Sequence, residues 1–582
     1  MESVTLAPAL VRAVDEHMRL ARDRDGVRGI AYGVVAAGVL VHAGGIGELA
    51  ENGGTPDEHS LFRMASLTKS FTASAVMHLR DAGRLRLDDP VAAHVPEAAA
   101  LRGPTADSPA ITLRHLLTMA SGLAGDNPWA DRHVDVGRAT MNAWLRGGAT
   151  FAHAPGTAYE YSNLGYGILG RVVENVSGRT LQSYVTNHLL IPLGMASTVW
   201  TLDAAPDGVC VAEGYQRIDG AWTPVGAPLG DGDLAALGGL WSTVSDLARW
   251  VTFFTDAFPA RDDPDTMPLA RASRREMQEV ATSWPLSMAS RHELTPPRAG
   301  PAGYGMGLCI RDDLVLGRLV EHAGGFPGFG SHMLWLPGRD AGVILLANET
   351  YAPMGVVAAD LVETLGEHHG LPRAHVPHAP VLERAAARLG GLVAAWDTEV
   401  AGELFSDNVF LDRPEAKRID EAAQLRHRHG RLGDATFDAR TLTAGTMRWQ
   451  TECGELRATL TLSPRVPPRV QWYEFTSVLP LGPAHAAAFT ALLDGVRDPG
   501  TIRVGALFTE EAQVTRLRER LRAVQFMFGA CAQAETVACD GGSTATVHWC
   551  GERADLDVAV TCVGDRIAQV AFHARPIGPA AE

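Results

Sequence analysis

Apolar and polar positions alternate with helical spacing at the start of the chain, over about residues 7–24, and again over about 66–82. Between these two predicted helices, residues 34–49 are apolar and interrupted by glycines, which is typical of short strands. From about 85 to 255 the spacing is mostly helical, with breaks at proline and glycine. The first part of the chain is therefore predicted to be a strand pair followed by a long helical region.

The pattern changes to short strand-like runs over residues 304–348, and a helix is predicted over about 354–367. The strand-like runs are YGMGLCI, GRLVEH, SHMLWLP and GVILLAN. Strands near both ends with helices between them indicate one sheet built from the two ends. We therefore expect an α/β domain over residues 1–370, with a helical subdomain inserted into it.

A proline-rich stretch follows, and we interpret residues 371–380 as a linker. Beyond it the chain repeats itself. Leu404-Phe405-Ser406-Asp407 recurs as Leu507-Phe508-Thr509-Glu510, Trp449…Cys453-Gly454-Glu455 as Trp549-Cys550-Gly551-Glu552, and Arg469-Val470…Phe475 as Arg566-Ile567…Phe572. We expect two copies of a small α+β or β-barrel domain, at 381–480 and 483–580, that shape, cover or oligomerise the first domain.

The amino-acid composition is typical of a chain with several globular domains, and it argues against nucleic acid and membranes as partners. The 582 residues are 46% hydrophobic and 20% charged, and the net charge is −16. An acidic chain is poorly suited to the phosphate backbone of nucleic acid. No apolar run approaches the length of a membrane span, and the first 24 residues have no apolar signal core. With seven cysteines, an odd number, we expect a cytoplasmic protein with no membrane or nucleic-acid partner.

Lysine is rare in this chain. Lys69 and Lys417 are the two lysines among 51 basic residues, and the other 49 are arginine. Arginine cannot lose its proton in a protein, whereas a desolvated lysine can. A lysine that is kept against such a bias is a candidate for proton transfer.

Lys69 stands in the segment Ser66-Leu-Thr-Lys69, at the start of a predicted helix. Positions i and i+3 share one face of a helix, so the amine can reach the serine hydroxyl. The start of a helix also favours developing negative charge on oxygen. Ser66 is therefore a candidate nucleophile and Lys69 a candidate base.

Two further segments carry candidate chemistry. Tyr161-Ser-Asn163 places a phenol, which becomes more acidic beside an ammonium, two residues from an amide that can donate to a substrate carbonyl. His322-Ala323-Gly324-Gly325 follows a predicted strand. Glycines on an edge strand admit a substrate backbone, and the N–H groups of Gly325 and Ser66 would form an oxyanion hole.

The order and spacing of these three segments resemble the serine β-lactamase and penicillin-binding-protein superfamily, in particular its class C-like branch of peptidases, esterases and acyltransferases. The resemblance covers about residues 7–370. It is carried by FRMASLTKSFTASAVMHLRDAGRLRLDDPVAAHVPE, ITLRHLLTMASGL, PGTAYEYSNLGYGILGRVVE, LGGLWSTVSDLARW and HAGGFPGFGSHMLWLPGRDAGVILLAN.

The resemblance implies a β-lactamase-like fold and an acyl-enzyme mechanism. Ser66 attacks a carbonyl, Lys69 and Tyr161 share the proton transfers, and Asn163 orients the substrate amide. His322 belongs to the same catalytic set. Ala323, Gly324 and Gly325 bind substrate, and no metal or organic cofactor is implied. Which of Lys69 and Tyr161 is the base stays open, because coupled groups titrate as a pair.

One departure from the family narrows the expected substrate. True β-lactamases of this branch usually have Lys-Thr-Gly where this chain has His322-Ala323-Gly324. Histidine is partly charged near neutral pH, so it is a weaker partner for a substrate carboxylate. The departure favours peptidase, amidase, esterase or acyl-transfer members. The arrangement of one catalytic and two C-terminal domains is similar to that of cytoplasmic D-aminopeptidases, and penicillin-binding-protein-type thioesterases have a related catalytic domain.

We therefore expect a serine hydrolase that cleaves an amide or ester bond in a small peptide-like or acyl substrate, of the D-aminopeptidase, amidase or esterase type. The alternative is an acyltransferase or peptide cyclase of secondary metabolism that uses the same acyl-enzyme. A β-lactamase, or a penicillin-binding sensor that acylates without turnover, ranks below both. The partner expected is a small molecule or peptide, together with homo-oligomerisation through the C-terminal repeats.

Overall fold

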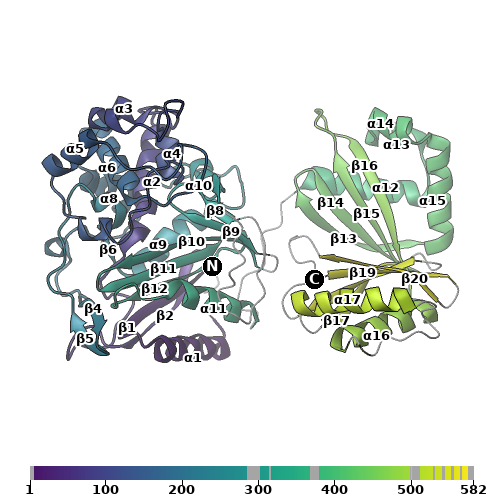
Figure 1. The fold of residues 1–582 in the computed structure, drawn as a ribbon. Helices are drawn as coiled ribbons and strands as arrows, with labels where there is room; N and C mark the ends of the chain where they lie inside the picture. The colour runs from purple at the N-terminus through teal and green to yellow at the C-terminus, as the bar shows by residue number, and fades with distance from the viewer. Residues whose placement is uncertain are drawn as a thin grey trace. The chain divides into compact units, whose positions relative to one another are not determined.

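The computed structural model describes residues 6–284, 302–313, 316–367, 379–498, 500, 511–528, 531–539, 544–551, 556–563 and 566–574. The chain divides into two compact units, which Figure 1 shows. The first comprises residues 1–291 and 299–374, and the second comprises residues 292–298 and 375–582. The predicted linker, 371–380, lies outside the described residues as far as position 378.

An eight-stranded antiparallel sheet forms the centre of the first unit, with the strand order β2-β1-β12-β11-β10-β9-β8-β7. Its strands come from both ends of the unit, as the sequence pattern predicts, and the expected α/β class is confirmed. The strands are β1 Gly29–Ala36, β2 Val39–Gly47, β7 Thr282–Ser283, β8 Ala302–Tyr304, β9 Cys309–Asp313, β10 Gly317–Phe326, β11 Phe329–Leu336 and β12 Ala341–Ala347.

Both faces of this sheet are covered, so every residue of β1, β11 and β12 is buried. Alternate side chains enter two different hydrophobic clusters, because successive residues of a strand point to opposite faces. One cluster lies under α1 Pro8–Asp25 and α11 Met354–Glu367, which pack on one face of the sheet (Figure 1). The other joins the opposite face to the helical region.

The helical region lies between β2 and β7, and its helices are separated by short turns and by two small two-stranded sheets. Its helices are η1 Ala65–Leu67, α2 Thr68–Asp81, α3 Val91–His94, η2 Pro96–Ala100, α4 Leu113–Leu117, η3 Ala130–Arg132, α5 Arg138–Gly147, α6 Asn163–Ser177, α7 Leu181–Val185, η4 Thr186–Leu190, η5 Leu202–Ala204, α8 Ala235–Gly238, α9 Val244–Thr255 and α10 Arg271–Met277. One of these sheets pairs β3 Phe62–Arg63 with β6 Trp241–Ser242, and the other is a hairpin of β4 Tyr215–Ile218 and β5 Ala221–Pro224. A short turn, η6 Pro337–Arg339, connects β11 and β12.

The helix α2 is fixed against α9 by stacked aromatic rings. Phe71 and Trp250 stack with their centroids 3.7 Å apart, and the indole N–H of Trp250 donates to Ser70 Oγ over 2.9 Å. Stacked aromatic pairs add to the stabilisation that comes from area burial. These contacts hold the helix that follows Ser66 in one orientation.

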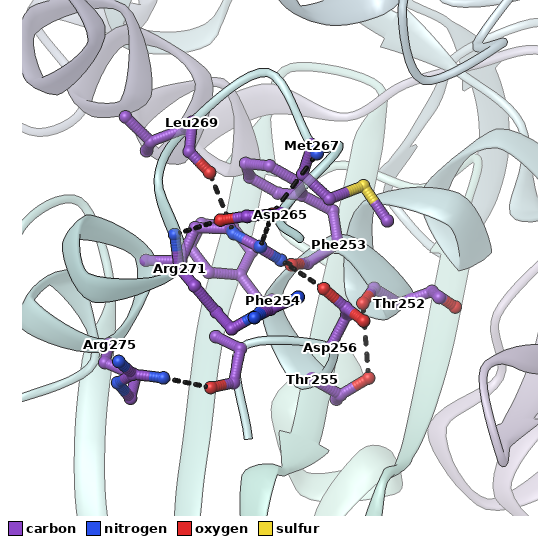
Figure 2. Close-up of polar contacts among 12 residues, drawn as sticks. Thr252, Phe253, Phe254, Thr255, Asp256, Asp265, Met267, Leu269, Arg271 and Arg275 are labelled. Atoms are coloured by element: carbon purple, nitrogen blue, oxygen red, sulfur yellow. Dashed lines mark hydrogen bonds and ion pairs between the residues drawn. The ribbon is translucent and has the colours of Figure 1, made fainter. Parts of the chain in front are cut away.

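A buried arginine ties α9 to α10. Arg274 is 0% exposed, and its guanidinium donates to Asp256 over 3.0 Å, to Asp265 over 2.8 Å and to two backbone carbonyls. Figure 2 shows Asp256 and Asp265 with the carbonyl-bearing residues Phe253 and Leu269 at this point. A buried charge is tolerated where it is paired and hydrogen-bonded, as it is here.

The second unit holds a second eight-stranded sheet, in the order β13 to β20. Its elements are α12 Pro380–Ala394, α13 Thr398–Leu404, α14 Asp407–Asp412, α15 Glu415–His429, β13 Leu432–Thr441, β14 Ala444–Thr451, β15 Gly454–Leu462, β16 Val470–Val478, α16 Pro483–Arg497, α17 Glu511–Phe528, β17 Cys531–Cys539, β18 Thr544–Gly551, β19 Leu556–Val563 and β20 Arg566–Ala574. The extra sheet-rich region beyond residue 380 agrees with the expected fold class.

The repeat in the sequence corresponds to a repeat of structure. In each half, helices precede four antiparallel strands, and Trp449 and Trp549 occupy the second strand of each set. The halves have separate hydrophobic clusters, and they join where β16 runs parallel to β17 through the pair Val478 and Cys539. The division into two domains, 381–480 and 483–580, stays a prediction, because the strands of both halves form one sheet.

Across the described residues, none of the helices combines the length and the apolar character that a membrane crossing requires.

Candidate active site

Ser66 lies in the turn η1, directly before α2 begins at Thr68. The helix was expected to include Ser66. Instead α2 begins two residues later, and Ala65, the first residue of the turn, has a left-handed backbone with φ of 50°, which is uncommon for a residue other than glycine. A contact from another element fixes this turn: the hydroxyl of Ser331 on β11 donates to the carbonyl of Met64 over 2.8 Å. Strained backbone of this kind persists where neighbouring contacts determine it.

The amine of Lys69 is fully buried between Ser66 and α8. Its Nζ lies 3.0 Å from Ser66 Oγ and 2.8 Å from the carbonyl oxygen of Leu237. Burial lowers the pKa of Lys69 to about 7, although the charges of Asp131 and Asp126 act in the opposite direction. Near neutral pH a large fraction of this amine is therefore uncharged and able to accept a proton.

Tyr161 lies immediately before α6, with its ring beside the same amine. Lys69 Nζ is 5.0 Å from the centroid of the Tyr161 ring. Burial raises the pKa of Tyr161 well above its ordinary value of 10, and the neighbouring Ser66 hydroxyl offsets only part of this effect. The phenol consequently keeps its proton over the physiological pH range.

His322 is on β10, and its hydrogen bonds define its tautomer. Its Nδ1 is 2.6 Å from the carbonyl oxygen of Ala323, which can only accept, so Nδ1 carries the proton. Its Nε2 therefore accepts from the hydroxyl of Tyr304, 3.0 Å away. Burial, followed by the charge of Lys69, lowers the pKa of His322 to about 3. The sequence suggested a partly charged histidine, whereas the structure has a neutral one.

Asn163 is the first residue of α6 and is 0% exposed. Its backbone N–H donates to Asp126 over 2.7 Å, and its side-chain amide donates to Asn127 over 2.6 Å. The side-chain oxygen is buried, and no described residue forms a hydrogen bond with it. Asn163 thus lies behind Asn127, which lines the pocket described below. Direct contact of Asn163 with substrate stays a prediction.

The glycines of β10 permit close packing around Ser66. A Cβ on Gly324 would lie 2.1 Å from Ser331 Oγ and 2.5 Å from the carbonyl oxygen of Met64, so a side chain has no room there. A Cβ on Gly325 would lie 2.5 Å from the ring of Tyr351. Only glycine lets this strand approach the turn that holds Ser66.

One edge of β10 is open beside these glycines. The strand pairs with β11 as far as Phe326, but its pairing with β9 ends at Glu321 and Cys309 within the described residues. Ala323, two positions further along, is exposed. An open strand edge offers backbone groups to an extended ligand.

A pocket of about 440 Å³ brings most of the predicted site together. Of the predicted residues, Ser66, Tyr161, His322, Ala323 and Gly325 line it, and Lys69, Asn163 and Gly324 lie behind the wall. The other lining residues are Asn127, Pro128, Asp131, Cys309 and Tyr351.

Several of the residues that shape this pocket could not be identified from the sequence. Tyr304 and Tyr351 stand in no recognisable motif, and the Leu237 carbonyl is a backbone group of a distant helix. The run Asp126-Asn127-Pro128 signals only a turn. Each of them contributes through packing between segments that are far apart along the chain.

Comparison with known proteins matches residues 11–366 to the family described as Beta-lactamase. Protein flp of Staphylococcus aureus (strain MW2) is 29% identical over 306 residues, which cover 49% of this chain and 52% of that protein. The D-alanyl-D-alanine-carboxypeptidase/endopeptidase AmpH of Escherichia coli (strain K12) is 28% identical over 302 residues, covering 51% of this chain and 72% of that protein. The chain thus spans about half the length of the first of these relatives.

Among solved structures, the octameric penicillin-binding protein homologue from Pyrococcus abyssi is similar over 97% of this chain and 98% of its own. The TM-score is 0.51 and the sequence identity is 19%, so the likeness concerns the fold.

Proposed function

Because this chain belongs to the Beta-lactamase family, we propose that it is a serine hydrolase that forms an acyl-enzyme on Ser66. Its substrate is a small peptide-like or acyl compound with an amide or ester bond. The observation that carries the proposal is the pair formed by Ser66 and Lys69. Their reacting atoms are 3.0 Å apart, and burial brings the pKa of the amine to about 7.

In the proposed reaction, Ser66 Oγ bonds to the substrate carbonyl carbon while its proton passes to the neutral amine of Lys69. The N–H groups of Ser66 and Gly325 are the proposed donors to the resulting oxyanion. Collapse of this intermediate breaks the bond to the leaving amine or alcohol, which takes up the proton from Lys69. Water then attacks the acyl group by the same route, which releases a carboxylic acid and restores Ser66.

The pKa values favour Lys69 over Tyr161 as the base. A general base works best when its pKa is near the operating pH, and that of Lys69 is about 7. The pKa of Tyr161 is well above 10, so the phenol is a donor in the resting protein. We assign Tyr161 to relaying the proton, so that it donates its hydroxyl proton to the leaving group and takes up the one held by Lys69.

The neutral His322 supports amidase, esterase or aminopeptidase chemistry over recognition of a substrate carboxylate. Its Nε2 is occupied by Tyr304 and its ring is uncharged near neutral pH. Among the described residues, neither lysine nor arginine lines the pocket. The AmpH relative is named a carboxypeptidase, so peptides are a reasonable substrate class here, but a free carboxylate lacks a cationic partner in the described lining.

The test is intact-protein mass spectrometry after exposure to a fluorophosphonate. We expect one adduct on the natural chain, none on Ser66→Ala, and slow labelling of Lys69→Arg, because a guanidinium cannot accept the proton. Equal labelling of Ser66→Ala, or no adduct on the folded natural chain, would contradict the proposal. Product analysis with and without an added amine separates hydrolysis from acyl transfer, and a single burst without turnover would indicate a sensor.

We also propose that the chain forms a homo-oligomer through its C-terminal repeats. The support is the fold likeness to a homologue described as octameric, which extends over nearly the whole chain. Native mass spectrometry of the full chain is expected to show a single oligomer. A monomer at micromolar concentration would contradict this proposal.

A further inference from the structure

The pocket beside Ser66 has an acidic side chain in its described lining and no cationic one. Among the described residues that line it, Asp131 alone has a carboxyl group, and lysine and arginine are absent from the lining. His322 is neutral near pH 7, because burial lowers its pKa to about 3. A ligand in this pocket therefore meets a carboxylate without a lining cation to balance it.

Asp131 is held in place by Tyr351. The carboxyl group is buried, with 3% of the residue exposed, and it accepts a hydrogen bond from the Tyr351 hydroxyl over 3.1 Å. Within the described part of the chain, Asp131 forms no ion pair with a lysine or arginine. Burial raises its pKa, and the charge of Lys69 acts in the opposite direction. The charges of Lys69, Arg63 and Arg132 act on this carboxylate, but none of these three side chains is among the described residues that line the pocket.

Tyr351 connects Asp131 to the strand that would bind the reacting carbonyl. Its backbone has a left-handed φ of 54°, and its ring packs so closely on Gly325 that a Cβ there would be 2.5 Å away. Asp131, Tyr351 and Gly325 therefore form one wall of the pocket that contains Ser66. A group bound to Asp131 lies in the same pocket as the serine hydroxyl.

We propose that Asp131 is a specificity-determining residue that binds a protonated amine of the substrate. The substrates would be amides or esters that carry a free ammonium group, such as amino-acid or peptide derivatives with an unblocked amine. A charge-assisted hydrogen bond to a carboxylate is about twice as strong as a neutral one. Because it names the substrate of the Ser66 acyl-enzyme, this inference rests on the proposed function.

Two matched pairs of thioesters test the inference and locate the amine. The first pair is a thioester of alanine and the same thioester of N-acetylalanine, which differ by a positive charge on the acyl part. Both enantiomers of this pair are used. The second pair, acetyl thioesters of 2-(dimethylamino)ethanethiol and of 3-methylbutanethiol, differs by a charge on the leaving group. Thiol release gives kcat/KM for the natural chain, for Asp131→Asn and for Asp207→Asn, an exposed aspartate that serves as the control.

We expect the natural chain and Asp207→Asn to prefer the charged member of one pair by about tenfold or more. In Asp131→Asn this ratio should fall to within about threefold of one, through a higher KM for the charged substrate. Loss of the Asp131 charge also lowers the pKa of Lys69, so the neutral substrate and the fluorophosphonate should react at least as fast as with the natural chain, which shows that the variant is folded and reactive. A preference for the charged member of the first pair places the amine on the acyl part of the substrate. A preference within the second pair places it on the leaving group.

Equal rates within both pairs for the natural chain would overturn the inference while leaving the proposed function intact. A parallel loss for charged and neutral substrates in Asp131→Asn would overturn it too, since that outcome indicates a structural role. Absence of turnover and of any fluorophosphonate adduct would overturn the proposed function, and this inference with it.

Discussion

A buried lysine amine opposes folding as long as it is protonated. For Lys69, folding lowers the pKa from 10.5 to about 7, which corresponds to roughly 5 kcal/mol at pH 7 and below. The unfolded chain binds the proton more tightly, so this penalty is complete below pH 7 and disappears as the pH rises toward 10.5. The group that the proposed reaction needs is therefore one that destabilises the fold.

We predict that Lys69→Met is inactive and more stable than the natural chain. Loss of the hydrogen bond to Leu237 offsets about 1–3 kcal/mol of the gain, so a net gain of roughly 2–4 kcal/mol is expected at pH 6. The gain should shrink toward pH 10. Urea unfolding of both proteins at several pH values measures it, and a gain that does not depend on pH would contradict a lowered lysine pKa.

The same lysine predicts the pH dependence of acylation. Only the neutral amine accepts the Ser66 proton, so the labelling rate should rise with pH through about 7 and then level off. Stopped-time labelling with a fluorophosphonate, whose own reactivity is constant over this range, gives the profile. A labelling rate that stays low through pH 7 and is still rising above pH 10 would instead assign the base to Tyr161.

Gly324 is predicted to be irreplaceable by alanine. The added Cβ would lie 2.1 Å from Ser331 Oγ and 2.5 Å from the Met64 carbonyl, so the turn that holds Ser66 must move. We expect a loss of about 1–3 kcal/mol in stability and a much slower labelling rate. Gly338→Ala is the control, because its Cβ would meet no atom within 4 Å. Normal labelling of Gly324→Ala would show that the turn tolerates displacement.

At the scale of elements, α9 and α10 depend on Arg274. Replacing this arginine by methionine leaves Asp256 and Asp265 without their shared partner and several carbonyls without a donor. Breaking a buried pair in this way costs about 3–5 kcal/mol. Arg388→Met, which removes an exposed pair with Glu403, should cost less than about 1 kcal/mol. Thermal unfolding compares the two variants, and equal effects would refute a special role for the buried arginine.

The sequence predicts contacts within an element better than contacts between elements. The spacing of Ser66 and Lys69 places them on one face, and their atoms lie 3.0 Å apart. The partner of Lys69 at Leu237, by contrast, is 168 positions away, and Tyr304 meets His322 from another strand. Such contacts depend on how strands and helices pack, which a single sequence does not encode locally. The left-handed φ of Ala65 arises in the same way, from contacts made by β11 and β6.

Fold class was predictable where periodicity is strong. The sheet made from both ends of residues 1–370 follows from the strand-like runs and is confirmed. The parallel pairing of β16 with β17 was not predictable, because one pair of residues, Val478 and Cys539, joins the two halves. Nothing in either repeat alone indicates that its partner continues the same sheet.

At the scale of the whole molecule, the hydrophobic clusters indicate where the chain can be divided. The two clusters of the first unit end at Leu346 and Leu365, and those of the second unit begin at Ala379. A fragment of residues 1–374 is therefore expected to fold and to react with a fluorophosphonate as fast as the full chain. Far-ultraviolet circular dichroism and intact mass measure both properties, and an unfolded fragment would show that the first unit needs the second.

The scarcity of lysine has a practical consequence for handling this protein. Of its two lysine side chains, Lys69 is 0% exposed, whereas Lys417 is on α15 with a side chain that is 67% exposed. An amine-reactive biotin or surface linker would therefore attach to the lysines at a single place, in the second unit. Molecules immobilised through Lys417 would share one orientation, and the pocket of the first unit would carry no label.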